Sequence, residues 1–222
     1  MFSIDEYMTK LTGLLRNAFG ARLLYVGLQG SYQRGEAGPQ SDIDVMVVLD
    51  TLSVSDLDRY RVLLKEAGEA ERACGFLCGA AELAAWNPYE ICHLLHTTED
   101  RYGRLAPLVP AYRKEDIRAF VKISLDNLYH ELCHRYLYAD REENIAALQG
   151  SYKSVFFLLQ NLMYLRTGEF VKTKRDLSAR LSGAEKMVMA WEQKLSHEKS
   201  YDFDMAFRVL FEWCRNTICE IG

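Results

Sequence analysis

Hydrophobic and polar residues alternate along the first hundred positions with the periods of short helices and strands. Ser3 to Ala18 carries an apolar stripe at helical spacing, opened by a capping box of Ser3 and Glu6. Leu23 to Leu28 is a short apolar run and predicts a buried strand. The same patterns predict strands over 42–50, 73–78 and 89–96, a helix from Ser53 or Ser55 to about Ala67, and a short helical segment over 79–86.

From Lys114 onward the hydrophobic positions follow helical spacing. The segment 97–113 contains Pro107 and Pro110 and little periodicity, which predicts a linker. We therefore expect an α+β protein with an α/β domain over 1–110 and an all-α helical bundle over 111–222. The expected helices of the second half cover 114–139, 141–167, 173–195 (with a break at Gly183) and 202–220.

Composition narrows the class of protein. The chain has 222 residues, 49% of them hydrophobic, with 27 basic and 31 acidic residues and a net charge of −4. This balance predicts a folded protein and argues against a nucleic-acid partner bound through a basic face. No apolar run reaches the roughly 20 residues that span a bilayer, so no membrane association is expected. Six cysteines without a CxxC motif favour reduced thiols and a cytoplasmic location.

The segment with the clearest chemical signal joins the first two predicted strands. Gly30-Ser31 ends the first strand, and Asp42-Ile43-Asp44 begins the second after ten intervening residues. Glycine lets the backbone approach a ligand closely, and free N–H groups of the turn can bind phosphate. Residues i and i+2 of a strand share a face, so Asp42 and Asp44 are expected to point the same way. Converging carboxylates beside phosphates are typical ligands of Mg²⁺.

This segment resembles the nucleotidyltransferase superfamily that includes DNA polymerase β, the aminoglycoside and lincosamide nucleotidyltransferases and small antitoxin nucleotidyltransferases. The resemblance implies a nucleotidyltransferase-fold mixed sheet followed by the helical domain. It also implies a nucleoside triphosphate co-substrate and a pair of Mg²⁺ ions, with Asp42 and Asp44 as catalytic residues and metal ligands. The residues that would contact the nucleotide are Gly30, Ser31, Arg34 (which would neutralise phosphate charge) and Ser41.

Active members of this superfamily usually place a third carboxylate on a later strand of the same sheet. Glu90, on the strand expected over 89–96, is our favoured third catalytic carboxylate. Glu82 is the alternative, and both fit equally well as solvated surface acids. Without a third acid, metal binding would be weaker and catalysis impaired.

The expected helix 141–167 contains a second pattern of the resemblance. Aminoglycoside nucleotidyltransferases carry a glutamate base one turn before a lysine near the phosphates, and Gln149 and Lys153 have this spacing. Lys153 is therefore expected to bind the nucleotide. Because glutamine cannot accept a proton, the base must lie elsewhere, and the candidates are Glu131, Glu142 and Glu143.

A zinc peptidase is a third, less favoured reading of the sequence. His130, Glu131 and His134 match the HExxH pattern. However, the apolar stripe of this helix lies on the opposite face, and no third ligand follows at a known spacing.

The favoured function is transfer of a nucleoside monophosphate to a hydroxyl of a small antibiotic-like molecule or of a protein. A homodimer remains an option, because aminoglycoside-modifying relatives can be dimers. The alternative is a catalytically impaired nucleotide-binding or antitoxin-like interaction module. The arginine and histidine spacing of the toxin partners is missing from the helical half, so ribonuclease activity is not expected.

Overall fold

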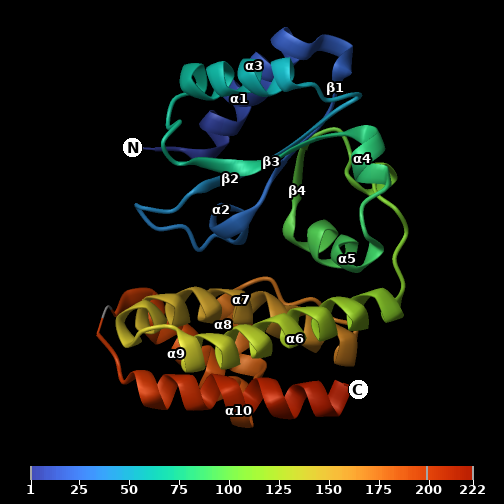
Figure 1. Cartoon of the computed structure of the whole chain (residues 1–222). Coiled ribbons are helices and arrows are strands. Elements are labelled where there is room, and N and C mark those ends of the chain that lie inside the picture. The colour runs from blue at the N-terminus through green and yellow to red at the C-terminus, as the bar shows by residue number, and fades with distance from the viewer. Residues whose placement is uncertain (1, 199, 222) are drawn as a thin grey trace. The chain divides into compact units, whose positions relative to one another are not determined.

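The computed structural model describes residues 2–198 and 200–221. The chain divides into two compact units, one ending at Tyr112 and one beginning at Arg113 (Figure 1). The first contains the sheet and the second is helical, which confirms the predicted α+β class.

A four-stranded mixed sheet organises the first unit, with strand order β3-β2-β1-β4. The two central strands β1 and β2 are antiparallel, β3 runs parallel to β2, and β4 is antiparallel to β1. The strand bounds are Leu23–Leu28 for β1, Ile43–Leu49 for β2, Ala73–Gly79 for β3 and Glu99–Tyr102 for β4. The first three strands were predicted within one residue or so of these bounds.

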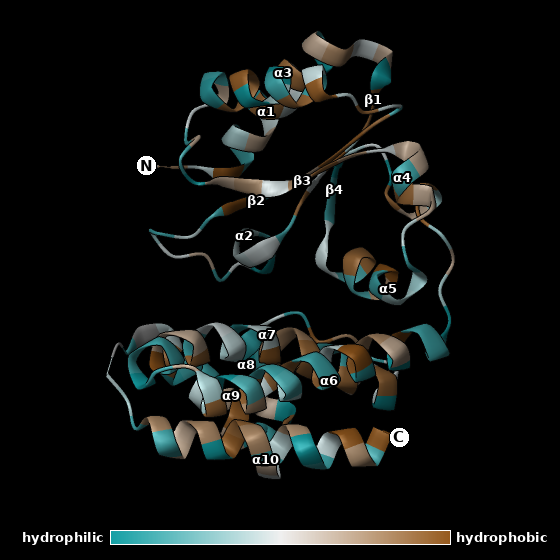
Figure 2. Ribbon diagram, in the orientation of Figure 1, coloured by the Kyte–Doolittle hydropathy of each residue, from teal (hydrophilic) through white to brown (hydrophobic). Residues whose placement is uncertain are grey.

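Alternation along β2 decides which side chains face which helices. Ile43, Val45, Val47 and Leu49 pack with α1 (Ile4–Phe19) and α3 (Val54–Ala67) on one face of the sheet. Met46 and Val48 lie in a second cluster, with α4 (Ala80–Ala84), on the other face. Since Asp44 alternates with the first set, it belongs to the second face. Figure 2 shows the hydrophobic residues concentrated along these central strands.

Two predictions for the segment 89–113 are wrong. The expected strand over 89–96 is a helix, α5 (Pro88–Thr97), because Asn87 caps it by accepting from the Tyr89 N–H and Pro88 occupies its first turn. The expected linker contains β4, which pairs with the free edge of β1. The remaining short elements are α2 (Gly30–Arg34) and two 3₁₀ turns, Gly20–Arg22 and Ala106–Leu108.

In the described part of the second unit, five helices pack around one hydrophobic core. Their bounds are close to the predicted ones, with the break at Gly183. Among the residues that the structure describes, no helix is long and apolar enough to cross a membrane. The helices are α6 (Lys114–Tyr138), α7 (Arg141–Thr167), α8 (Lys174–Arg180), α9 (Gly183–His197) and α10 (Phe203–Ile221).

A charged network ties the start of α3 to the residue before β1 and to the residue after β2. Arg22 donates two hydrogen bonds to the Asp56 carboxylate, at 2.9 and 3.0 Å, and one to Asp50 at 3.1 Å. Asp56 also accepts from the N–H of Ser53, the N-cap of α3. The hydrogen bonds from Arg22, followed by those from Ser53, lower the pKa of Asp56 well below its usual range.

This pKa shift predicts how stability depends on pH. A carboxyl whose pKa is lowered on folding stabilises the protein above its unfolded pKa of about 4, and that contribution is lost as the pH falls further. We expect Asp56→Asn to lower the free energy of unfolding at pH 7, and the difference from the wild type to shrink steadily below about pH 4. Urea unfolding at several pH values measures this. Asp58→Asn is the control, because its pair with Arg61 is exposed; a pH-independent effect of Asp56→Asn would contradict the account.

Candidate active site

Gly30 and Asp44 lie in direct contact where β1 ends. The N–H of Gln29 donates to the backbone carbonyl of Asp44 at 2.8 Å. Gly30 has a positive φ of 69°, and a Cβ at this position would lie 1.8 Å from Oδ2 of Asp44. Only glycine can therefore occupy position 30, and the fold brings the Gly30-Ser31 bend against the Asp-x-Asp segment.

Asp42 and Asp44 act on one another electrostatically. Asp42 is exposed immediately before β2, whereas Asp44 is half-buried. Burial raises the pKa of the Asp44 carboxyl; a hydrogen bond with Cys74 lowers it, the negative charge of Asp42 raises it, and the positive charge of Arg34 lowers it. The two carboxylates and Arg34 thus share one polar site at the end of the sheet.

Cys74 is the member of this site that the sequence analysis missed. It pairs with Asp44 in the register of β2 and β3, its thiol is hydrogen-bonded to the Asp44 carboxylate, and the residue is exposed. The neighbouring strand thus places a thiol beside Asp44. Nowhere in the described ranges 2–198 and 200–221 do three or more His, Cys, Asp or Glu side chains gather to hold a metal ion. The carboxylates of this site are therefore the pair Asp42 and Asp44, without a third acid beside them.

Arg72 holds the backbone that precedes Asp42. Its Nε and Nη2 both donate to the carbonyl of Ser41 at 3.1 Å, and its own carbonyl accepts from the N–H of Ile43 at 2.8 Å. Nη2 also donates to the hydroxyl of Tyr32 in α2. One side chain therefore connects α2, the residue before Asp42 and the start of β3.

The other predicted nucleotide contacts lie on α2 and in the loop that follows it. Arg34 is largely buried, and its Nε forms an ion pair with Glu36 at 3.0 Å. The carbonyl of Ser31 accepts from the N–H of Glu36 at 2.9 Å, and the Ser41 hydroxyl accepts from the N–H of Gly38, also at 2.9 Å. These bonds close the loop back toward Asp42.

The placement expected for Glu90 is wrong in one respect. Glu90 lies in the first turn of helix α5 rather than on a strand, and its carboxylate accepts a hydrogen bond from the indole N–H of Trp86. Glu82 is exposed on α4. Neither acid belongs to β3, the strand next to Asp44.

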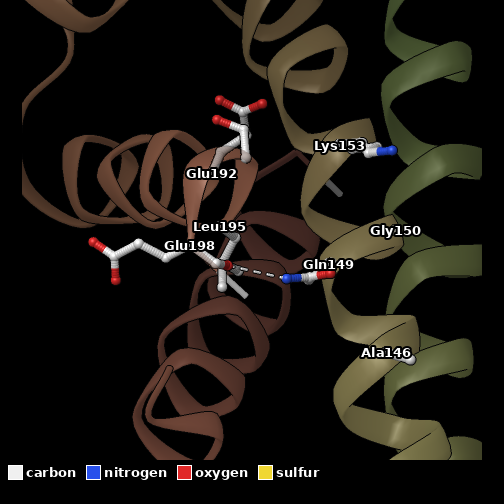
Figure 3. A pocket seen from close by; sticks show the side chains of 8 residues that line it. Ala146, Gln149, Gly150, Lys153, Glu192, Leu195 and Glu198 are labelled. Carbon is white, nitrogen blue, oxygen red and sulfur yellow. Dashed lines mark hydrogen bonds between the residues drawn. The ribbon is translucent and has the colours of Figure 1, made fainter. Parts of the chain in front are cut away.

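The candidate residues of the helical unit lie on α6 and α7. Lys153 and Gln149 line a hollow of that unit (Figure 3). His130 and His134 are exposed on α6 with ring centroids 6.1 Å apart, and Glu131 pairs with Arg135 at 3.0 Å. In the part of the chain that the structure describes, no third donor completes a zinc site with them. Glu142 and Glu143 are exposed in the first turn of α7.

Comparison with known proteins agrees with the geometry of the first unit. Residues 15–74 match the family model of the nucleotidyltransferase domain. A candidate protein adenylyltransferase of Methanocaldococcus jannaschii is 37% identical over 60 residues. That segment covers 27% of this chain and 38% of the relative.

One solved structure extends the likeness to the whole fold. A spectinomycin adenyltransferase of Enterococcus faecalis, crystallised with ATP and spectinomycin, matches over 98% of this chain and 100% of its own, with a TM-score of 0.61 and 13% identity. A toxin–antitoxin structure with AMP-PNP matches over 59% of this chain and 93% of its own, at a TM-score of 0.32 and 23% identity. Residues 15–74 thus match a nucleotidyltransferase domain, and the chain as a whole shares the fold of the spectinomycin adenyltransferase.

Proposed function

We propose that the protein is a nucleotidyltransferase that moves a nucleoside monophosphate from a nucleoside triphosphate to a hydroxyl group. The observation that carries this proposal is the contact of Gly30 with Asp44, with Asp42 and Arg34 close enough to shift the pKa of Asp44. The domain match over residues 15–74 supports the same reaction class.

The donor set suits Mg²⁺. This ion is usually bound by one or two carboxylates together with substrate phosphates and water, and Asp42 and Asp44 supply the carboxylates. When bound, Mg²⁺ would stabilise negative charge on the phosphoryl oxygens. The triphosphate would lie along the Gly30-Ser31 bend, where the first N–H groups of α2 have no partner within the helix. Arg34, Ser41 and Lys153 are the further proposed nucleotide contacts.

The reaction follows from these roles. The acceptor oxygen attacks the α-phosphorus, the bond from that phosphorus to the β-phosphate oxygen breaks, and pyrophosphate leaves. The hydroxyl proton passes to a base, for which Glu131, Glu142 and Glu143 remain the proposed residues. Gly30 and Ser31 keep the triphosphate oriented for in-line displacement.

The acceptor is proposed to be a small molecule or a protein side chain. The fold of the spectinomycin adenyltransferase extends over 98% of this chain, which supports a small-molecule acceptor held by the helical unit. The candidate protein adenylyltransferase supports a protein acceptor. Spectinomycin and a set of peptides bearing serine, threonine and tyrosine are therefore the first acceptors to assay.

Cys74 favours a second candidate, a nucleotide-binding module with impaired catalysis. The family resemblance implies a third carboxylate on a neighbouring strand, and β3 offers a thiol beside Asp44 instead. Glu90, the carboxylate proposed for this role, lies on a helix and is hydrogen-bonded to Trp86.

Replacing either aspartate tests the principal proposal. We expect Asp42→Asn and Asp44→Asn each to lower pyrophosphate release from ATP, CTP, GTP or UTP, assayed with Mg²⁺ and the acceptors named above, by at least about 100-fold, because each removes a metal ligand. Asp58→Asn is the matched control on exposed α3, and thermal unfolding checks that the variants fold. Full activity of both variants would contradict the proposal.

Cys74→Asp distinguishes the two candidates. If the missing carboxylate limits metal binding, the variant should bind Mg²⁺ with nucleotide about tenfold more tightly, since affinity rises with ligand charge. It should also release pyrophosphate faster. Cys74→Ser is the control of similar size without charge. Equal binding and turnover in the two variants would show that the thiol position plays no part.

Arg72 is expected to position Asp42 rather than to touch substrate. Arg72→Gln removes the two guanidinium hydrogen bonds to the Ser41 carbonyl. It should weaken metal-dependent nucleotide binding about tenfold. Arg72→Lys should recover little of this affinity, because lysine cannot make the paired contact. Calorimetry with ATP and Mg²⁺ measures both, with Arg61→Gln as the exposed control. A loss of thermal stability with unchanged affinity would assign Arg72 a purely structural role.

A further inference from the structure

Phe2 packs on side chains that hold the backbone next to the candidate site. It directly precedes Ser3, the N-cap of α1. Its ring centroid lies 5.7 Å from that of Tyr32 in α2, in an edge-to-face arrangement, and 4.8 Å from the guanidinium carbon of Arg72. Phe2 therefore contacts both partners of the hydrogen bond that connects α2 with the residue before β3.

The fold of the first unit fixes where the Phe2 ring lies. Tyr7 is only 5% exposed and belongs to the hydrophobic cluster that α1 and α3 form with the sheet. The Phe2 ring lies against it, with the two centroids 6.1 Å apart. The hydroxyl and the carbonyl of Ser3 accept from the N–H groups of Glu6 and Tyr7, which anchors the backbone just after Phe2.

The Phe2 ring supplies Arg72 with a contact that its hydrogen bonds do not. The N–H groups of the guanidinium donate to the Ser41 carbonyl, the Tyr32 hydroxyl and the Glu69 carboxylate. These bonds occupy most of the edge of the planar group, and the aromatic ring adds a cation–π contact. A ring beside the guanidinium also excludes water that would compete for these hydrogen bonds.

The hydrogen bonds of Arg72 reach both parts of the candidate site. Tyr32 lies in α2, whose first residues form the Gly30-Ser31 bend. Ser41, whose carbonyl accepts from Arg72, directly precedes Asp42. A displaced guanidinium would therefore change the position of the bend relative to the aspartates.

We propose that Phe2 is a positioning residue of the candidate nucleotide site. Its ring holds the Arg72 guanidinium in place, and Arg72 in turn keeps α2 and the peptide before Asp42 in the arrangement that binds metal and triphosphate. This inference rests on the proposed function. It deepens that function by giving a role to a residue outside the segment 15–74 that matches the domain model.

Calorimetry on the full chain with ATP and Mg²⁺ tests the proposal. Phe2→Ala should weaken binding about twofold to fivefold, the size expected for one cation–π contact at a partly exposed site. Phe2→Tyr keeps an aromatic face and should bind like the wild type, whereas Phe2→Leu keeps apolar volume without that face and should bind as weakly as Phe2→Ala. In assays of turnover, KM for ATP should rise by the same factor with little change in kcat.

Leu57→Ala is the matched control for Phe2→Ala. Leu57 lies on α3 of the same unit and is 42% exposed, close to the 37% of Phe2. Its truncation removes a similar amount of exposed apolar surface away from Arg72, and it should leave the affinity for ATP unchanged.

A double-mutant cycle shows whether Phe2 acts through Arg72. In the Arg72→Gln background the guanidinium is absent, so Phe2→Ala should cause no loss of affinity beyond that of Arg72→Gln alone. If the two losses instead multiply, Phe2 acts by another route and the inference is wrong.

Hydrogen–deuterium exchange of the ligand-free protein separates this inference from the proposed function. Phe2→Ala should speed exchange over residues 30–43, which include the Ile43 N–H bonded to the Arg72 carbonyl, and Phe2→Tyr should not. Unchanged exchange there in Phe2→Ala, or unchanged affinity where the wild type binds ATP, would overturn the inference. Faster exchange in Phe2→Ala with no nucleotide binding by the wild type would contradict only the proposed function.

Discussion

The close approach of Gly30 to Asp44 is the constraint on which the rest of the candidate site depends. The Asp44 carboxylate occupies the space that any side chain at position 30 would need. The chain also passes position 30 with a positive φ, where it turns out of β1 and into α2. This single contact brings the Gly30-Ser31 bend and a pair of carboxylates to one end of the sheet.

Neighbouring interactions keep that contact in place. Pairing of β1 with β2 fixes the register of Asp44, and the hydrogen bond from Gln29 to its carbonyl fixes the backbone beside it. Arg72 holds the peptide before Asp42 from the start of β3. The helical unit is built differently, because one hydrophobic core orders its helices and leaves Lys153 and the acids Glu131 and Glu143 at its surface.

Local patterns predicted the elements whose signals do not depend on distant residues. Ser53 and Gly68 mark both ends of α3, and the Gly30-Ser31 and Asp42-Asp44 spacing indicated two segments that the fold brings into contact. Apolar periodicity could not distinguish a short buried helix from a strand over 89–96, and the signal for a helix lay in Asn87-Pro88, which cap and begin α5. Cys74 was missed because its position beside Asp44 arises from the register of β2 and β3, which no local pattern contains.

The most direct test of the central claim is a crystal structure of the protein grown with Mn²⁺ and a non-hydrolysable ATP analogue. The account predicts an anomalous peak between the carboxylates of Asp42 and Asp44, with the triphosphate lying along Gly30 and Ser31. A nucleotide bound elsewhere, or an anomalous peak away from both aspartates, would contradict it.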